Sequence, residues 1–238
     1  MRKILVIARR EMAGYFLSPM AYVVGALYML ASALWFFHKL FIQGNEASLR
    51  PLFEAMAYIM VPAVPLLTMK QVSEEYRSGT IETLLTAPVT DAQIILGKFL
   101  GVMVFYLALL AGTGAFLVLM ILYGQPDAGV AAMGYLGMVL LGAAFVAVGI
   151  FTSTLTAYQL VAAISAGAIL AAFAIVMQLI VAFGPDPWNY LAARLNAMTY
   201  FKDFARGVFD TRGVIFFLSA AALFLFLSVK TLESRRWR

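Results

Sequence analysis

The sequence contains no cysteine, a single histidine and few charged residues. Without cysteine, the chain forms no disulfide and offers no thiolate as a nucleophile or metal ligand. Charged residues make up 12% of the 238 positions, about half the share that is usual in soluble domains, whereas hydrophobic residues make up 63%. This composition predicts an integral membrane protein whose residues 1–238 form one membrane domain without a separate soluble part.

Several patterns that carry chemistry are also missing. The sequence has no G-x-x-x-x-G-K-[ST] phosphate-binding loop, and its nearest approach, Gly97-Lys98-Phe99, leads into an apolar run. No group of His, Asp and Glu has the spacing of a metal site. Ser153 and Ser165 lack a histidine base and a nucleophile elbow, and no basic stripe with interleaved aromatic residues indicates nucleic-acid binding. We therefore expect no enzymatic activity, bound cofactor or metal in this chain itself.

Six apolar runs are long enough to cross a bilayer, at residues 20–37, 52–69, 99–123, 130–151, 160–183 and 213–229. A helix needs roughly 20 apolar residues to cross a ~30 Å core, and a lipid-facing backbone of this length must be helical. The predicted fold is an all-α membrane protein with six transmembrane helices. No ionisable residue lies near the middle of a run, which argues against an ion-coupled carrier without excluding one, since backbone carbonyls can bind sodium.

Positive charges predict the orientation of the spans. Most of the 17 Lys and Arg residues fall on the side that holds both termini, which the positive-inside rule assigns to the cytoplasm. Residues 2–17 separate an apolar helical face, which includes Leu5, Met12 and Phe16, from a basic face with Arg2 and Arg9. This pattern predicts an amphipathic helix that lies on the inner leaflet.

The stretch SEEYRSGTIETLLTAPV, residues 73–89, lies between two apolar runs and contains three glutamates, a glycine and a proline. Gly79 permits a bend of the backbone, Thr80 can cap a following helix, and Pro88 ends that helix. The apolar residues of this short helix share one face: Ile81, Leu84 and Leu85. The sequence thus predicts a two-turn amphipathic helix beneath the membrane.

The apolar face of this helix needs a cover. Lipid headgroups are one candidate, but the nearby Glu74, Glu75 and Glu82 are repelled by an anionic leaflet. A groove in a cytoplasmic partner fits better, and an ordinary solvated loop that folds back on itself is an equal alternative. Thr90 and Gln93 then form a predicted capping box, from which a helix runs on into the third span.

The run SEEYRSGTIETLLTAPVTDAQIILGKFLG resembles the cytoplasmic loop of ABC-2 type transporter permeases, and it is most similar to the gliding-motility-associated permeases and their relatives. Three further segments resemble the same family in the same order: FLSPMAYVV at 16–24, VGIFTSTLTAYQLVA at 148–162 and RGVFDTRGVIFFLS at 206–219. The most specific motif is G-T-x-E-x-L-L-x-x-P, which begins at Gly79 and ends at Pro88. The likeness covers nearly the whole chain.

The resemblance implies that residues 80–87 form a coupling helix that docks into a cleft of an ATP-binding subunit. Ile81, Leu84 and Leu85 would be its anchors, and the glutamates would face basic residues of that subunit: Glu74, Glu75 and Glu82. The resemblance further implies two ATP-binding subunits that hold ATP and Mg²⁺, a second permease copy or a related permease, and a possible membrane partner with a periplasmic domain. The location would be the bacterial cytoplasmic membrane.

The 184–212 loop, in the same resemblance, holds short helices that dip into the outer leaflet. Phe201, Lys202, Arg206 and Arg212 would then lie at an outer gate or contact a periplasmic partner. An interfacial loop with snorkelling basic side chains is an equal alternative.

The function implied by the resemblance is that of the membrane subunit of an ABC transporter, which couples ATP hydrolysis by another subunit to export or to work outside the cytoplasm. A force-transmitting scaffold for a periplasmic machine would have the same sequence features. An ion-coupled secondary transporter is a more distant alternative. The sequence does not predict a substrate, because an apolar span can face lipid, a partner helix or a cargo.

Overall fold

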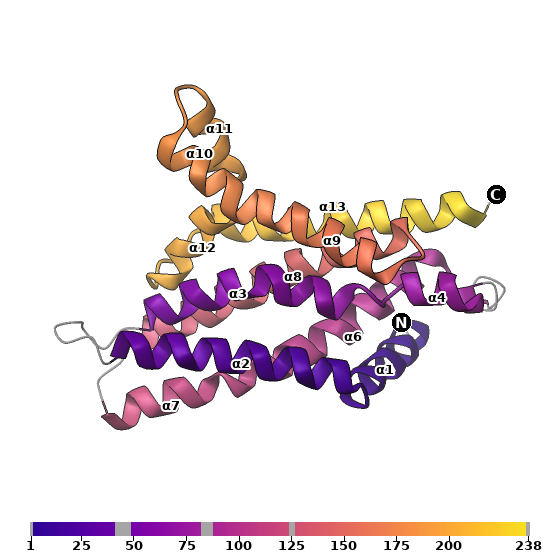
Figure 1. Cartoon of the computed structure of the whole chain (residues 1–238), viewed down its shortest axis with the longest axis horizontal. Helices are drawn as coiled ribbons and strands as arrows, with labels where there is room; N and C mark the ends of the chain where they lie inside the picture. The colour runs from indigo at the N-terminus through magenta and orange to yellow at the C-terminus, as the bar shows by residue number, and fades with distance from the viewer. Residues whose placement is uncertain (1, 41–48, 82–87, 124–126, 237–238) are drawn as a thin grey trace.

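The computed structural model describes residues 2–40, 49–81, 88–123 and 127–236, and all regular elements in these ranges are helices. Figure 1 shows their arrangement. In chain order they are α1 (Arg2–Phe16), α2 (Pro19–Leu40), α3 (Arg50–Thr68), α4 (Ser73–Ser78), α6 (Asp91–Gly112), α7 (Gly114–Tyr123), α8 (Ala128–Leu155), α9 (Gln159–Ala171), the π-helix η1 (Ala172–Val176), α10 (Met177–Phe183), α11 (Trp188–Leu195), α12 (Ala197–Ala205) and α13 (Thr211–Arg236).

Six helical stretches within these ranges are long and apolar enough to cross a membrane, and each contains one of the predicted runs. The third stretch begins earlier than its apolar run, at Asp91, because the cap at Thr90 starts the helix outside the apolar part. It is interrupted at Thr113, which lies between α6 and α7 and whose hydroxyl donates to the carbonyl of Leu110 at 2.6 Å.

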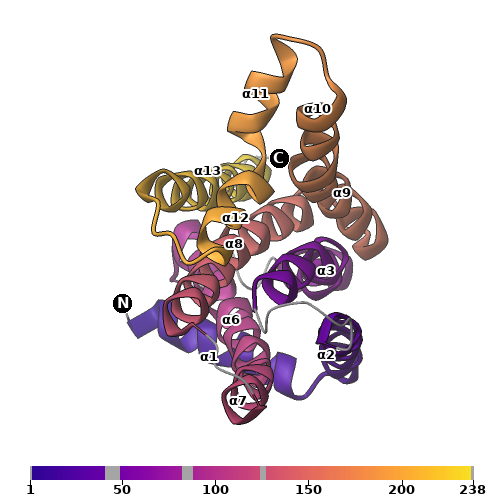
Figure 2. The same ribbon diagram turned by 90° about the vertical axis from the view of Figure 1, so that its left-hand side faces the viewer.

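Helix α8 forms the centre of the bundle. It packs against α3, α6, α9, α12 and α13, as the end-on view shows (Figure 2). Its glycines allow close approach: a Cβ at Gly142 would lie 2.3 Å from the ring of Tyr106 on α6. The outer helices α2, α9 and α13 expose large apolar side chains, as expected for surfaces that face lipid or another subunit.

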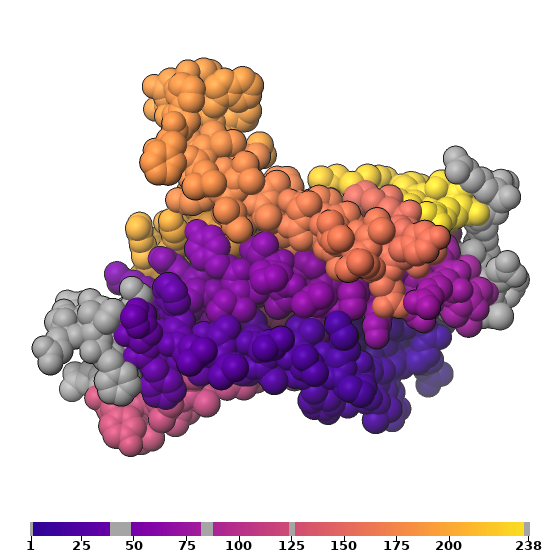
Figure 3. Space-filling model, in the orientation of Figure 1, coloured from indigo at the N-terminus to yellow at the C-terminus, as the bar shows by residue number. Residues whose placement is uncertain are grey.

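The fifth span leaves the bundle. It continues from α9 through η1 into α10, which forms a hairpin with α11 that projects from the rest of the molecule (Figure 3). Helix α12 returns to the bundle and packs on α8, where a Cβ at Gly137 would lie 3.3 Å from the ring of Phe201. Phe201, which was predicted to lie at an outer gate or to contact a partner, is 1% exposed and packs in the core of this chain. Arg206 and Arg212 are exposed, and Lys202 is half-buried.

Helices α1 and α4 lie together at one end of the bundle, called here the α1 end, and the α10–α11 hairpin and α12 lie toward the other (Figure 1). Helix α1 packs across the beginning of α6. The predicted amphipathic segment 2–17 is thus a helix that crosses the bundle end and does not continue the axis of a span.

Candidate functional site

Two glycines at the start of α6 receive α1 at close range. A Cβ at Gly97 would lie 2.6 Å from Cγ2 of Ile7, and one at Gly101 would lie 2.6 Å from Cβ of Glu11. Small residues four positions apart let two helix backbones approach closely. Here they fix α1 against α6, so that polar side chains of α1 reach the lysine between the two glycines, Lys98.

Lys98 is the centre of an ion cluster, defined as Arg10, Glu11, Glu75 and Lys98. Its side chain is 1% exposed, and its Nζ lies 2.8 Å from Oε1 of Glu75 and 3.2 Å from Oε1 of Glu11. A buried ammonium group is tolerated where charged and hydrogen-bonding partners surround it. The two carboxylates supply that environment, and each is 15% exposed.

Arg10 completes the ion cluster from the solvent side. Its Nη2 lies 2.7 Å from Oε1 of Glu11 and 3.3 Å from Oε1 of Glu75. The hydrogen bond with Glu11 raises the pKa of the Arg10 guanidinium. Two cations therefore share two carboxylates. The ion cluster joins α1, α4 and α6, and its most distant members, Arg10 and Lys98, are 88 positions apart in the sequence.

The turn between α3 and α4 is held by a serine of α8. The backbone N–H groups of Val72 and Ser73 donate to Oγ of Ser153 at 3.0 and 3.1 Å, and that hydroxyl donates to the carbonyl of Met69 at 3.0 Å. One buried hydroxyl thus satisfies three backbone groups. The start of α4 is thereby attached to the central helix.

Two further contacts extend from α4 to other helices. The side-chain amide of Gln159, at the start of α9, donates to Oε2 of Glu74. The guanidinium of Arg235, near the end of α13, lies 4.5 Å from the centre of the Tyr76 ring, a distance at which a cation and an aromatic face attract each other. Helix α4 therefore contacts α1, α6, α8, α9 and α13 through polar or cationic groups.

The predicted bend follows directly after α4. Gly79 has φ of 72°, in the left-handed region that glycine adopts without steric cost, and it ends α4. Thr80 and Ile81 then begin a helical turn. Residues 82–87 lie outside the described residues, and with them the predicted contacts of Glu82, Leu84 and Leu85.

The far side of the segment begins at Pro88, whose carbonyl accepts a hydrogen bond from Nζ of Lys3 on α1. The predicted capping box is confirmed. The backbone N–H of Gln93 donates to Oγ1 of Thr90 at 3.3 Å, and that of Thr90 donates to Oε1 of Gln93 at 3.3 Å. Both ends of the 73–90 segment are therefore fixed, one by the ion cluster and one by α1 and α6.

Two of the predicted partner contacts are made within this chain instead, and a third residue stays exposed. Glu75 was expected to face a basic residue of another subunit, but its carboxylate binds Lys98 and Arg10 of its own chain. Ile81 was expected to anchor the segment in a partner, but it is 8% exposed and belongs to the chain's own core. Glu74 remains exposed, with Gln159 as a partner within the chain.

Four members of this site were not predicted from the sequence: Arg10, Glu11, Lys98 and Ser153. The sequence did contain an indication for Lys98, which lies between Gly97 and Gly101 at the start of an apolar helix. Where another helix packs on these glycines, the lysine is buried and needs a carboxylate to compensate its charge. Its partners could not be identified, since they come from α1 and α4, remote in sequence.

The contacts of α4 attach it to much of the helical bundle. Within the described ranges, no group of three or more His, Cys, Asp and Glu could hold a metal ion. The fixed charges and hydrogen bonds instead attach one short helix to five others, so that a displacement of α4 has to move or break contacts with each of them.

A known protein family matches almost the entire chain. A family model described as "ABC-2 family transporter protein" matches residues 5–232. This range includes α4, the whole ion cluster and the first five candidate spans, and it ends within the sixth. A search of curated proteins finds no match.

Proposed function

The chain belongs to the ABC-2 family of transporter proteins, and from this premise we propose that it is the permease subunit that receives the work of ATP hydrolysis at the α1 end. Residues 1–238 contain no phosphate-binding loop, so ATP would be bound and hydrolysed by an ATP-binding subunit that acts on this membrane part. The side of the bundle that carries α1 and α4 is then cytoplasmic, in agreement with the distribution of Lys and Arg.

The observation that carries the proposal is the attachment of α4. Residues 80–87 follow Gly79, which ends α4, and precede Pro88, whose carbonyl accepts a hydrogen bond from Lys3 of α1. Force applied to this short connection reaches α6 through Glu75 and Lys98, which are 2.8 Å apart, and reaches α8 through the hydrogen bonds of Ser153. Both helices are candidate spans. A partner that moves the 80–87 connection would thereby move the membrane part.

Leu84 and Leu85 are proposed as the contacts with the ATP-binding subunit, on the strength of the sequence pattern and the family. Ile81 is buried in this chain's own core and is therefore not proposed as a contact with that subunit. The complete assembly would contain two ATP-binding subunits and a second permease, in the cytoplasmic membrane of a bacterium. The gliding-type subfamily and a companion protein with a periplasmic domain are proposed on sequence likeness alone.

Co-purification tests the proposal. The double variant L84D/L85D places two carboxylates on the proposed docking face, and we expect the amount of co-purified ATP-binding subunit to fall roughly tenfold or more, as for the loss of central apolar contacts in an interface. The matched control is V208D/F209D, which makes the same change at two exposed apolar positions near the opposite end. Full retention of the ATP-binding subunit by L84D/L85D would contradict the proposed docking.

A further inference from the structure

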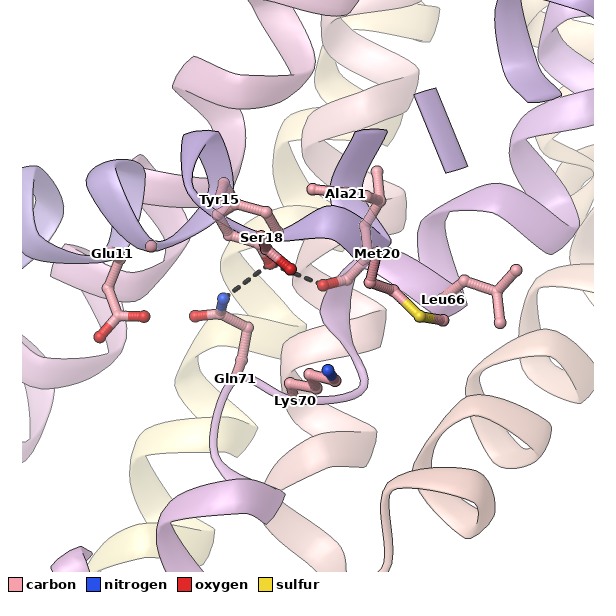
Figure 4. A pocket seen from close by; sticks show the side chains of 10 residues that line it. Glu11, Tyr15, Ser18, Met20, Ala21, Leu66, Lys70 and Gln71 are labelled. Carbon is pink, nitrogen blue, oxygen red and sulfur yellow. Dashed lines mark hydrogen bonds between the residues drawn. The ribbon is translucent and has the colours of Figure 1, made fainter. Parts of the chain in front are cut away.

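A cavity of about 160 Å³ opens at the α1 end, between α1, the start of α2 and the turn after α3. This volume holds considerably more than one water molecule. Figure 4 shows Glu11 on one side, Met20 and Leu66 on the other, and Lys70 and Gln71 between them. The complete lining is Glu11, Gly14, Tyr15, Ser18, Met20, Ala21, Leu66, Leu67, Lys70 and Gln71.

The amide of Gln71 has an unused acceptor. Gln71 is 5% exposed, and its Nε2 donates to the hydroxyl of Tyr15 at 2.7 Å. That hydroxyl donates its single proton to the carbonyl of Leu67 at 2.6 Å, and burial raises the pKa of Tyr15, which keeps the proton in place. Tyr15 can therefore only accept from Gln71, and this fixes the amide with its NH₂ group toward Tyr15.

The orientation of the amide leaves Oε1 of Gln71 buried and, among the described residues, without a hydrogen-bond partner. Buried polar atoms without a partner are uncommon in native proteins, and each one calls for an explanation. A ligand in the cavity that offers an N–H or O–H group would give Oε1 of Gln71 the hydrogen-bond donor that it lacks.

The charges around the cavity have a definite arrangement. Lys70 is exposed at its rim, and the described residues supply no carboxylate within ion-pair distance of its ammonium group. Glu11 lies deeper and shares its carboxylate with Lys98 and Arg10. The cavity thus presents a cation at its rim and acceptor oxygens inside, which is complementary to a ligand with an outer anion and an inner donor.

The position of the cavity identifies the class of ligand. Met20 and Leu66 are exposed at its mouth, one at the first turn of the first candidate span and one near the end of α3. Phe16 and Leu17, which follow Tyr15, are exposed too. Such a band of exposed apolar side chains beside a lysine is typical of the boundary between acyl chains and headgroups. A ligand that enters here has its polar part in the cavity and its apolar part along these side chains.

From this geometry we propose that the cavity binds the headgroup of a phospholipid that carries both a phosphate and a primary ammonium group, as phosphatidylethanolamine does. The phosphate contacts Lys70, and an N–H of the ammonium group reaches Oε1 of Gln71, with the carboxylate of Glu11 behind it. The site does not depend on the proposed coupling role, since it requires only that the α1 end lies at a membrane surface.

A series of headgroups with successive N-methyl groups tests the assignment. Phosphatidylethanolamine, its N-methyl and N,N-dimethyl derivatives and phosphatidylcholine keep the charges but lose N–H donors one by one. Native mass spectrometry of the purified protein with these lipids, all with the same acyl chains, should show roughly tenfold tighter binding of the first than of the last, as expected for one charge-assisted hydrogen bond. Equal binding of phosphatidylethanolamine and phosphatidylcholine would overturn the proposal.

Two variants assign the contacts. Q71M should remove the discrimination along the methyl series, and K70Q should weaken binding of every member roughly tenfold. The control for K70Q is K202Q, which removes a lysine toward the opposite end and should leave binding unchanged. If Q71M does not fold, the series on the wild type and the comparison of K70Q with K202Q still decide. Equal effects of K70Q and K202Q would refute the phosphate contact.

Competition distinguishes a lipid from a soluble ligand of the same chemistry. Free phosphoethanolamine, at the concentration of the lipid, should not displace phosphatidylethanolamine, because it lacks the acyl chains that lie along Met20 and Leu66. Displacement at equal concentration would assign the cavity to a soluble phosphate amine and overturn the lipid assignment. A preference for phosphatidylglycerol, which has hydroxyl donors and no ammonium group, would overturn the zwitterionic assignment.

Discussion

Replacing Lys98 by methionine removes the charge at the centre of the ion cluster while it keeps most of the side-chain volume. The ammonium group is 2.8 and 3.2 Å from the carboxylates of Glu75 and Glu11, and its side chain is 1% exposed. Removing one partner of a buried ion pair costs about 3–5 kcal/mol, because the other charge stays buried and uncompensated. Arg10 remains as a second cation, so we expect the lower end, about 3 kcal/mol.

A loss of about 3 kcal/mol corresponds to a decrease in Tm of about 6–12 °C by the scaling for a chain of this size. The assay is thermal unfolding of the purified protein in detergent, followed by intrinsic fluorescence. The matched control is K230M, because Lys230 forms an exposed salt bridge with Glu233 at 2.7 Å. Exposed pairs contribute roughly 0–1 kcal/mol, so K230M should change Tm little.

A triple variant separates lost charge pairing from lost packing. In K98M/E11Q/E75Q no uncompensated carboxylate remains, and replacement of a whole buried ionic group is often close to neutral. We expect it to recover most of the Tm lost in K98M. A Tm of K98M equal to that of K230M would refute the reasoning, as would a triple variant that is less stable than K98M, since the cost would then not come from the unpaired carboxylates.

Two further changes test how α1 and α4 are attached. G101V should lower the free energy of unfolding by about 1–3 kcal/mol through overpacking, because a Cβ at Gly101 would lie 2.6 Å from Glu11 of α1. The control G114V should lower it far less, because nothing lies within 4 Å of a Cβ at Gly114. Thermal unfolding measures both variants, and equal losses would contradict the close packing of α1. S153A should leave two backbone N–H groups of the α3–α4 turn without their acceptor, at a cost of about 2 kcal/mol or more. Hydrogen exchange should become faster at these amides in S153A and remain unchanged in the control S219A; unchanged exchange in both would show that Ser153 does not hold α4.

Local features of the fold could be predicted because their cause lies within a few residues. The apolar runs predict the six long helices, since a helix of this length in lipid satisfies its own backbone. The capping box of Thr90 and Gln93 and the left-handed Gly79 were also predictable, because each depends on near neighbours in the sequence. The break at Thr113 was not predicted, since the apolar run continues across it without proline or charge.

The contacts of the candidate site could not be predicted, because they join segments remote in sequence. Glu75 is as suitable for a partner subunit as for Lys98 until the packing of α1 and α4 on α6 is known. Phe201 lies in a loop rich in aromatic residues, and its burial depends on Gly137 of α8, which lacks a side chain at the point of contact. In both cases, tertiary packing decides between an exposed and a buried role that composition leaves open.

The absence of cysteine from the chain allows a direct test of the proposed coupling role, since a single cysteine can be introduced and labelled alone. With a photoreactive benzophenone attached at L85C, illumination of the assembled complex should crosslink this chain to the ATP-binding subunit, whereas the same label at V208C near the opposite end should not. A crosslink from V208C, with none from L85C, would contradict the claim that the segment after α4 is where the ATP-binding subunit acts on the membrane helices.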